Sequence, residues 1–212
     1  NTLEYIKSLN LIESSKLKLL YDPIINIKDI NNKIHKKIDQ NNYFLSVGRL
    51  TKQKNFLFLC KAFKELIKEN KELKLVIAGK GEEETNIKRF IAKHNLEKNI
   101  ISVGHVQNIY PYFKNSNGFI LTSLWEDPGF VLIEASYCRT VVLSCNSWPG
   151  PSELIKDEFN GIVFENNDLE SFLKKFKYLI KFKNTNNLKF NNLKLCKKFT
   201  LFNHYKNLNK LI

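Results

Sequence analysis

The chain has 212 residues, 43% of them hydrophobic, which is enough for one large globular domain or for one domain with appended segments. The start, NTLEYIKSLN, has neither the basic nor the apolar region of a signal peptide, and no stretch reaches the roughly 18 to 20 uninterrupted apolar residues that cross a membrane. We therefore expect a soluble globular protein, and from its cysteines a cytoplasmic one. Lysine and arginine (34) outnumber aspartate and glutamate (21), and the net charge of +13 fits a nucleic acid, an anionic membrane or an anionic substrate as partner, or simply a solvated basic face.

The first forty residues differ from the rest of the chain. An amphipathic stretch is followed by KLKLLYDPI at residues 16–24 and then by a polar segment rich in asparagine and lysine. We interpret residues 1–38 as the end of another domain together with an interdomain linker. Because the chain does not start with methionine, we expect a further segment to precede it.

From residue 43 onward, short apolar runs alternate with longer stretches of helical periodicity, which is typical of βαβ units on a parallel sheet. The runs predict strands at residues 43–47, 73–79, 100–104, 118–123, 140–144 and 161–165. The stretches between and after them predict helices at 55–69, 82–95, 109–113, 130–138, 151–157 and 168–182, the last with Asp168 as its N-cap. The sequence therefore predicts an α/β fold, a Rossmann-like doubly wound parallel sheet of about six strands over residues 39–183, with a helical tail at 184–212.

In such a sheet, ligands bind beyond the carboxyl ends of the strands, so the loops that follow the strands are the informative segments. The first strand leads into GRLTKQKN at residues 48–55, where Arg49 and Lys54 surround the start of a helix. A guanidinium, an ammonium and the free N–H groups of a helix end together suit a diphosphate. Gly48 either lets the backbone approach a ligand or makes a plain strand-to-loop turn.

Two further loops contribute weaker signals. GKGEEE at residues 79–84 matches neither a Walker P-loop nor the GxGxxG spacing, so Gly79 and Gly81 either line a cleft or make the βα turn. In GHVQN at residues 104–108, backbone groups around Val106 can hydrogen-bond to a base. We interpret His105 as a loop histidine rather than a catalyst.

The stretch WEDPGFVLIEA places two glutamates around a helix start. Glu126 precedes the Pro128–Gly129 turn, and Glu134 lies one turn inside the helix that begins at Phe130. An anion is expected at the first N–H groups of that helix, and carboxylates on both sides of it suit a ligand with hydroxyls at both ends and phosphate in the middle. Each glutamate also has a plainer explanation, a helix-terminal charge for Glu126 and a solvent-facing position for Glu134, although the apolar neighbours of Glu134 favour a ligand.

The four cysteines show neither a CxxC motif nor the Cys/His spacing of a metal site, so we expect reduced thiols. No D-x-D pair occurs at any aspartate, and we therefore expect no metal and no cofactor. Base-reading motifs and interleaved aromatic and basic residues are also missing, so we expect no nucleic-acid partner.

Taken in order, these motifs resemble the nucleotide-binding half of the family-four (group 1) retaining glycosyltransferases, which have the two-domain GT-B fold. The resemblance covers about residues 16–182 and rests on SVGRLTKQKN, IAGKGEEE, WEDPGFVLIEA and GPSELIKDEFNGIVFE. It departs from the family at EDPGF, where E-G-F-G is usual, and at KQKN, where an ending in KG or KN is typical. The first departure concerns the loop over the donor sugar.

The resemblance implies a hexosyltransferase that moves a sugar from a nucleotide diphosphate sugar to an acceptor hydroxyl with retention, in glycan, lipopolysaccharide or glycolipid biosynthesis. It implies that Arg49 and Lys54 hold the donor diphosphate, that Glu126 contacts the sugar and that Glu134 contacts the ribose. We count Glu126, Arg49 and Lys54 as catalytic. The implied donor-binding set is Gly48, Arg49, Lys54, Gly79, Gly81, Val106, Glu126, Gly129, Phe130, Val131 and Glu134.

The family also has an N-terminal domain that binds the acceptor, and only its end resembles this chain. We therefore expect the 212 residues to be a donor-binding domain that needs this domain as its partner, with contact to the cytoplasmic face of an anionic membrane as a further expectation. Two alternatives stay open. The chain is either a non-catalytic nucleotide-sugar-binding module that works with a separate chain, or a basic membrane-surface protein.

Overall fold

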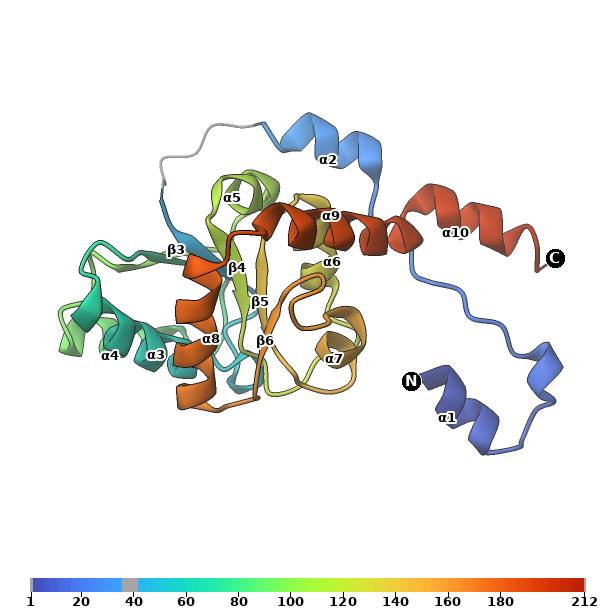
Figure 1. The fold of residues 1–212 in the computed structure, drawn as a ribbon, viewed down its shortest axis with the longest axis horizontal. Helices are drawn as coiled ribbons and strands as arrows, with labels where there is room; N and C mark the ends of the chain where they lie inside the picture. Colours follow the sequence, from blue (N-terminus) through green and yellow to red (C-terminus); the bar gives the residue numbers. More distant parts are fainter. Residues whose placement is uncertain (1, 36–41, 212) are drawn as a thin grey trace.

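The computed structural model describes residues 2–35 and 42–211, and its centre is a six-stranded parallel sheet (Figure 1). The strand order is β3-β2-β1-β4-β5-β6. This order confirms the predicted doubly wound α/β fold. The strands are β1 (Phe44–Val47), β2 (Leu75–Ala78), β3 (Ile100–Gly104), β4 (Gly118–Leu121), β5 (Val142–Cys145) and β6 (Ile162–Phe164).

Helices cover both faces of the sheet, and this explains why the strands are apolar without a polar face. In β1, Phe44 packs on one face and Leu45 on the other, as the alternation of side chains along a strand requires. Helices α3 (Phe56–Glu69), α4 (Glu84–Lys93) and α8 (Leu169–Lys181) lie on the Phe44 side, and α5 (Tyr110–Asn115), α6 (Phe130–Tyr137) and α7 (Gly150–Leu154) on the Leu45 side.

The segments before and after the sheet are in contact around Ile25. They comprise α1 (Thr2–Ser8), η1 (Ser14–Lys16) and α2 (Ile27–Lys33) at one end, and α9 (Thr185–Cys196), η3 (Lys197–Phe199) and α10 (Leu201–Leu208) at the other. The backbone of Ile25 pairs with the segment around Thr200. The Ile25 N–H donates to the Phe199 carbonyl at 2.9 Å, and the Leu201 N–H donates to the Ile25 carbonyl at 3.0 Å. Ile25 and Phe199 share a buried cluster with Ile133 of α6. The end of the expected linker, residues 36–38, and the expected domain boundary at 39 lie outside the described residues.

The connections between strands determine where the site lies. From β1 the chain continues to β2 and β3 on one side, and it then crosses to β4, β5 and β6 on the other. The loops that follow β1 and β4 therefore diverge at the carboxyl edge of the sheet, and this is the point where ligands bind in open α/β sheets.

All four cysteines are free, and all four are buried. Within the part of the chain that the structure describes, no helix is both long and apolar enough to span a membrane.

Candidate functional site

The loops after β1 and β4 are hydrogen-bonded to each other at the carboxyl edge of the sheet. The backbone N–H of Leu124 donates to the Gln53 carbonyl at 2.8 Å, and the Gln53 side chain donates to the Trp125 carbonyl at 2.9 Å. The Thr122 hydroxyl donates to the Lys54 carbonyl at 3.1 Å. These contacts hold the two loops as one unit, so the side chains that they carry have fixed relative positions.

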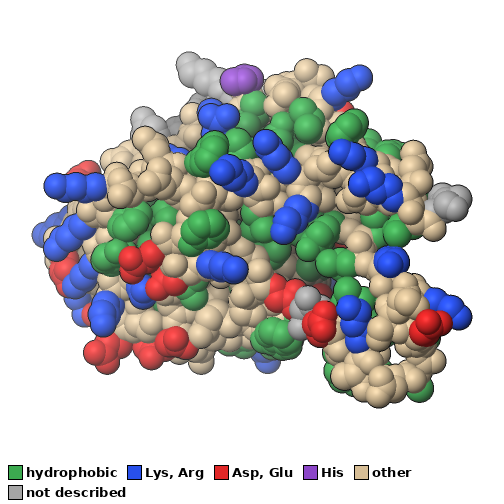
Figure 2. All heavy atoms as spheres, turned by 45° about the vertical axis from the view of Figure 1, so that its right-hand side comes forward, with side chains coloured by type: hydrophobic (Ala, Val, Ile, Leu, Met, Phe, Trp, Pro, Cys, Tyr) green, Lys and Arg blue, Asp and Glu red, His purple; other side chains and the backbone are tan. Residues whose placement is uncertain are grey.

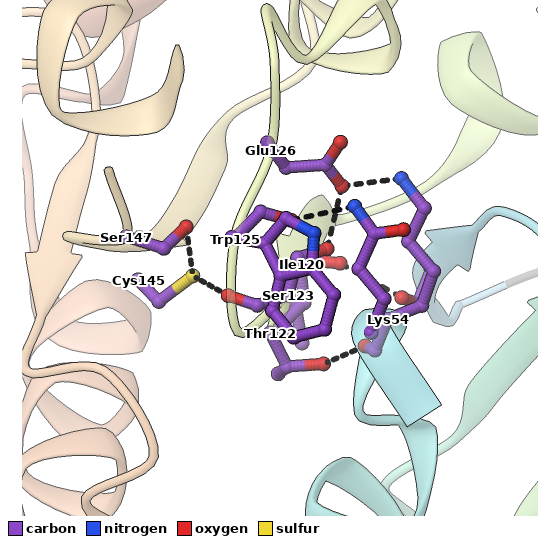
Figure 3. A network of polar contacts seen from close by, with 10 residues as sticks. Lys54, Ile120, Thr122, Ser123, Trp125, Glu126, Cys145 and Ser147 are labelled. Atoms are coloured by element: carbon purple, nitrogen blue, oxygen red, sulfur yellow. Dashed lines mark hydrogen bonds and ion pairs between the residues drawn. The ribbon is translucent and has the colours of Figure 1, made fainter. Parts of the chain in front are cut away.

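Lys54 and Glu126 form an ion pair between these two loops (Figure 3). The Lys54 ammonium contacts Glu126 Oε1, and the Ser123 hydroxyl donates to the same oxygen at 2.6 Å. Glu126 is 5% exposed, so its charge is largely removed from water and depends on these two donors. Both charged residues were predicted at the cleft, but their direct pairing was not, and Ser123 was missed. The S-x-x-E spacing from Ser123 to Glu126 was the sequence pattern that could have indicated this contact.

The turn before α6 requires a glycine. Gly129 has a φ of 84°, in the left-handed region, and it is the N-cap residue of α6. A Cβ built on Gly129 would lie 3.7 Å from Glu126 Cβ, so the turn and the glutamate are neighbours. Phe130 and Val131 follow as the first helical residues, and the N–H groups in the first turn of a helix have no partner inside it. The start of α6 can therefore accept an anion or a hydroxyl oxygen.

A pocket of about 240 Å³ opens beside this pair, at the carboxyl ends of β1, β2 and β3. Arg49 and Lys80 at this pocket form no ion pair with any described residue, whereas the charge of Lys54 is balanced by Glu126. The pocket is therefore positively charged and suits an anion. Lys80 was not predicted, although it directly follows the glycine that ends the second predicted strand. The lining residues are Val47, Gly48, Arg49, Ala78, Gly79, Lys80, His105, Val106 and Ile109.

The glycines of the first two loops have different neighbours. A Cβ on Gly79 would lie 1.9 Å from the Gly48 carbonyl oxygen, so close approach of the two strand ends requires glycine there. Gly81 is equally restricted, because a Cβ would lie 2.4 Å from the Leu50 carbonyl oxygen. Gly81 does not line the pocket, and its contact with a donor stays a prediction. At Gly48 a Cβ would meet Lys54 Cδ at 3.4 Å, so the Lys54 side chain passes beside the pocket.

Glu134 faces Tyr110 in α5, an arrangement that the sequence did not indicate. Glu134 is half-buried, and burial raises the pKa of its carboxyl group, while a hydrogen bond from the Tyr110 hydroxyl opposes that rise. Burial, followed by the nearby Glu134 charge, raises the pKa of Tyr110 to about 12. Tyr110 directly follows Ile109, which lines the pocket, but neither Tyr110 nor Glu134 lines it. The only sequence feature that could have indicated this contact was an aromatic residue at the start of the helix that follows the GHVQN loop.

The structure thus gathers the predicted residues into three groups. Arg49, Val106 and two of the glycines line the pocket, Lys54 pairs with Glu126 beside Gly129, and Glu134 pairs with Tyr110. Lys54, Glu126 and Glu134 are not part of the pocket lining itself. Among residues 2–35 and 42–211, no group of three or more His, Cys, Asp or Glu side chains is arranged to hold a metal ion.

Comparison with known proteins places this geometry in context. Residues 27–192 match the model of the family described as glycosyl transferases group 1. A similar curated protein is the Escherichia coli UDP-Gal:alpha-D-GlcNAc-diphosphoundecaprenol alpha-1,3-galactosyltransferase, 34% identical over 158 residues, which cover 72% of this chain and 40% of the relative. Another is the Campylobacter jejuni N-acetylgalactosamine-N,N'-diacetylbacillosaminyl-diphospho-undecaprenol 4-alpha-N-acetylgalactosaminyltransferase, 31% identical over 170 residues, which cover 80% of this chain and 46% of the relative.

Among solved structures, Anabaena HepE in complex with UDP and glucose has a TM-score of 0.76 at 16% sequence identity. The match covers 96% of this chain and 58% of HepE, and it shows a shared fold. The chain spans less than half the length of the two curated relatives.

Proposed function

The chain belongs to the group 1 glycosyl transferases, and on this premise we propose that it is the donor-binding part of a retaining glycosyltransferase. The proposed reaction moves a sugar from a nucleotide diphosphate sugar to an acceptor hydroxyl. The observation that carries the proposal is the Lys54–Glu126 pair at the carboxyl edge of the sheet, beside a cationic pocket that Arg49 lines. A nucleotide sugar needs both features, since it joins an anionic diphosphate to a neutral polyhydroxyl group.

The cations at this edge would stabilise the leaving group. Negative charge develops on the departing nucleoside diphosphate as the bond to the sugar breaks, and fixed positive groups lower the barrier most where that charge appears. Arg49 can bind two phosphate oxygens through its guanidinium, and Lys80, which also lines the pocket, adds a second positive charge. Lys54 would contribute as well, shared between the diphosphate and Glu126. These residues supply positive charge without a metal ion, which supports a metal-independent donor site.

The two glutamates would recognise the two ends of the donor. We assign the sugar hydroxyls to Glu126, whose neighbours Gly129, Phe130 and Val131 begin α6 and offer N–H groups to sugar and phosphate oxygens. We assign the ribose hydroxyls to Glu134, because its half-buried carboxylate lies beside Tyr110, the residue that follows Ile109 of the pocket lining. A carboxylate is the side chain best suited to accept hydrogen bonds from a vicinal diol.

The relatives suggest the chemical setting. The names of the Escherichia coli and Campylobacter jejuni enzymes describe transfer to diphospho-undecaprenol-linked sugars, and HepE was solved with UDP and glucose. We therefore propose a uridine diphosphate sugar as donor and a lipid-linked or glycan acceptor. An enzyme with a lipid-linked acceptor would work at a membrane surface, and the +13 charge of the chain fits an anionic one.

Calorimetry with UDP, UDP-galactose, UDP-glucose and UDP-N-acetylglucosamine tests the proposal. The chain should bind UDP and at least one of the sugars, with and without EDTA. Glu134→Ala should weaken UDP and the nucleotide sugar alike, by roughly 10- to 150-fold, because a charged hydrogen-bond acceptor is lost. Glu126→Ala should weaken only the nucleotide sugar, because the freed Lys54 can still contact the diphosphate.

Glu97→Ala is the matched control, since Glu97 is an exposed glutamate that precedes β3, at the opposite edge of the sheet. It should leave every affinity unchanged. Absence of binding to all four compounds would contradict the proposed donor site. Loss of binding in EDTA that Mg²⁺ or Mn²⁺ restores would contradict metal independence.

A further inference from the structure

Glu126 uses a single carboxylate oxygen for both of its side-chain contacts. Oε1 pairs with the Lys54 ammonium and accepts the Ser123 hydroxyl at 2.6 Å. An oxygen of a carboxylate has two lone pairs, so these donors occupy both of them. Ser123 is fully buried, and in such a water-poor setting the hydrogen bond is stronger than in solution.

The other oxygen, Oε2, is open. Within residues 2–35 and 42–211 no donor contacts it, and it is not among the side-chain atoms that are both buried and unpaired. It therefore keeps contact with solvent, and Figure 3 shows it pointing away from the Ser123 and Lys54 contacts. Glu126 is thus anchored through one oxygen and presents the other to a ligand.

Ser123 is held in place by its own backbone. The Cys145 thiol donates to the Ser123 carbonyl at 3.1 Å, and the N–H of the next residue, Leu124, donates to the Gln53 carbonyl at 2.8 Å. Burial raises the pKa of the Cys145 thiol, so the thiol stays protonated and remains a donor. Hydrogen bonds to β5 and to the loop after β1 therefore fix the backbone position from which the Ser123 side chain extends.

We infer that Ser123 is a positioning residue for sugar recognition, which acts by orienting the Glu126 carboxylate so that Oε2 faces the donor sugar. The inference rests on the proposed function, because it takes the ligand at Oε2 to be the sugar of a nucleotide sugar. Without the serine hydroxyl, Oε1 keeps only Lys54, and the carboxylate can turn about its terminal bond, which has a broad torsional preference. Ser123 itself touches no ligand, so its removal affects the sugar and spares the nucleoside diphosphate.

The test compares Ser123→Ala, Ser123→Thr and Ser144→Ala by calorimetry with UDP and UDP-galactose. Ser144 is the matched control, because it is also fully buried and donates its hydroxyl to a backbone carbonyl, that of Cys145 at 2.9 Å. Ser123→Ala should weaken UDP-galactose roughly 3- to 10-fold, the range for one lost hydrogen bond, and leave UDP within about twofold. Ser123→Thr keeps the hydroxyl and should restore the affinity, and Ser144→Ala should change neither ligand.

An equal loss for both ligands, or the same loss in Ser144→Ala, would reduce Ser123 to a structural role and overturn the inference. A crystal structure of Ser123→Ala gives a readout without ligand. A Glu126 carboxylate that is rotated away from its original plane supports positioning, and an unchanged carboxylate overturns it. If the unmodified chain binds neither UDP nor UDP-galactose, the proposed function fails, while this crystal structure still decides the role of Ser123.

Discussion

Two opposing influences act on the carboxyl group of Glu134. Burial against α5 raises its pKa above the ordinary value of 4.5, and the hydrogen bond from the Tyr110 hydroxyl acts to lower it. Burial is the stronger of the two, so the pKa in the folded protein is raised. Folding therefore favours the protonated form of Glu134, and its ionisation at neutral pH reduces the stability of the fold.

The raised pKa of Glu134 gives a prediction for Glu134→Gln, which replaces the carboxylate by a neutral group of the same shape. The contribution of Glu134 to stability is fully present below pH 4.5 and is lost as the pH rises through the raised pKa. The free energy of unfolding of Glu134→Gln, relative to the unmodified chain, should therefore be higher at pH 7 than at pH 4. Urea denaturation at the two pH values measures this difference.

Glu97→Gln, at an exposed position, is the control and should show no comparable change with pH. A relative stability of Glu134→Gln that stays constant or falls between pH 4 and pH 7 would contradict the argument.

For single residues, the sequence predicts which side chains lie at the carboxyl edge of the sheet but not how they pair. Strand order alone places Arg49, Lys54 and Glu126 at one edge, because parallel strands share the direction of their carboxyl ends. The ion pair between Lys54 and Glu126 joins loops 72 residues apart, so it depends on how far each side chain extends. The contact of Tyr110 with Glu134 likewise depends on the packing of two helices, which periodicity does not determine.

Helix α8 shows how a local signal and a packing signal combine in one element. Asp168 begins it as predicted, with Oδ1 accepting the Ser171 N–H at 2.9 Å. The buried face then presents Phe172, Phe176 and Leu179 to the sheet, and Phe176 lies 4.7 Å from Phe44 between ring centroids. The N-cap satisfies a backbone donor at the start of the helix, and the aromatic residues supply the apolar surface that holds the helix in place.

We predict that Asp168→Ala lowers the free energy of unfolding by about 1 kcal/mol, the usual loss when an N-cap acceptor is removed. Asp168→Asn keeps an oxygen at the same place and should lose much less. Because α8 lies on the far side of the sheet from Glu134, UDP binding should be unchanged in both variants. Urea denaturation and calorimetry measure the two effects, and equal destabilisation by Ala and Asn would show that the cap contributes nothing.

Among the elements, the strands are the most predictable and the terminal segments the least. Strands buried on both faces are continuous apolar runs, and their sequence alone marks them. Helical periodicity also indicates α9 within the tail, but it does not reveal that α9 packs on α6. The backbone pairing of Ile25 with the segment at Thr200 joins the two ends of the chain, and no local pattern encodes such a contact.

At the scale of the whole molecule, charge and apolar surface are distributed differently. Lysine and arginine side chains spread over the face seen in Figure 2 with hydrophobic side chains between them, and they do not gather into one patch. Apolar side chains are most exposed in the terminal segments, where Leu11 is 80% and Phe202 is 71% exposed. The three most exposed large apolar side chains among the described residues, Leu11, Phe202 and Tyr5, all lie in these terminal segments, outside the part of the chain that forms the sheet.

The final prediction is that these 212 residues bind a donor but transfer no sugar by themselves. The pocket, Arg49 and the Lys54–Glu126 pair all belong to the donor side of the proposed reaction. Glu126 lines none of the four pockets identified among the described residues, so none of these four places an acceptor against it. Positioning of the acceptor hydroxyl is worth about 7 to 11 kcal/mol of the barrier, so its absence should reduce transfer to an undetectable rate.

The assay incubates the chain with a nucleotide sugar that it binds and with a panel of sugar and lipid-linked acceptors, and it measures labelled sugar in the acceptor fraction. The same assay with a longer protein of the relatives' length, in which this chain forms the donor-binding part, is the positive control, and Glu126→Ala in that protein is the negative one. The chain alone should give the no-enzyme background, and the longer protein should exceed it. Transfer by the 212 residues above that background would show that they position both substrates, and the donor-only assignment would be wrong.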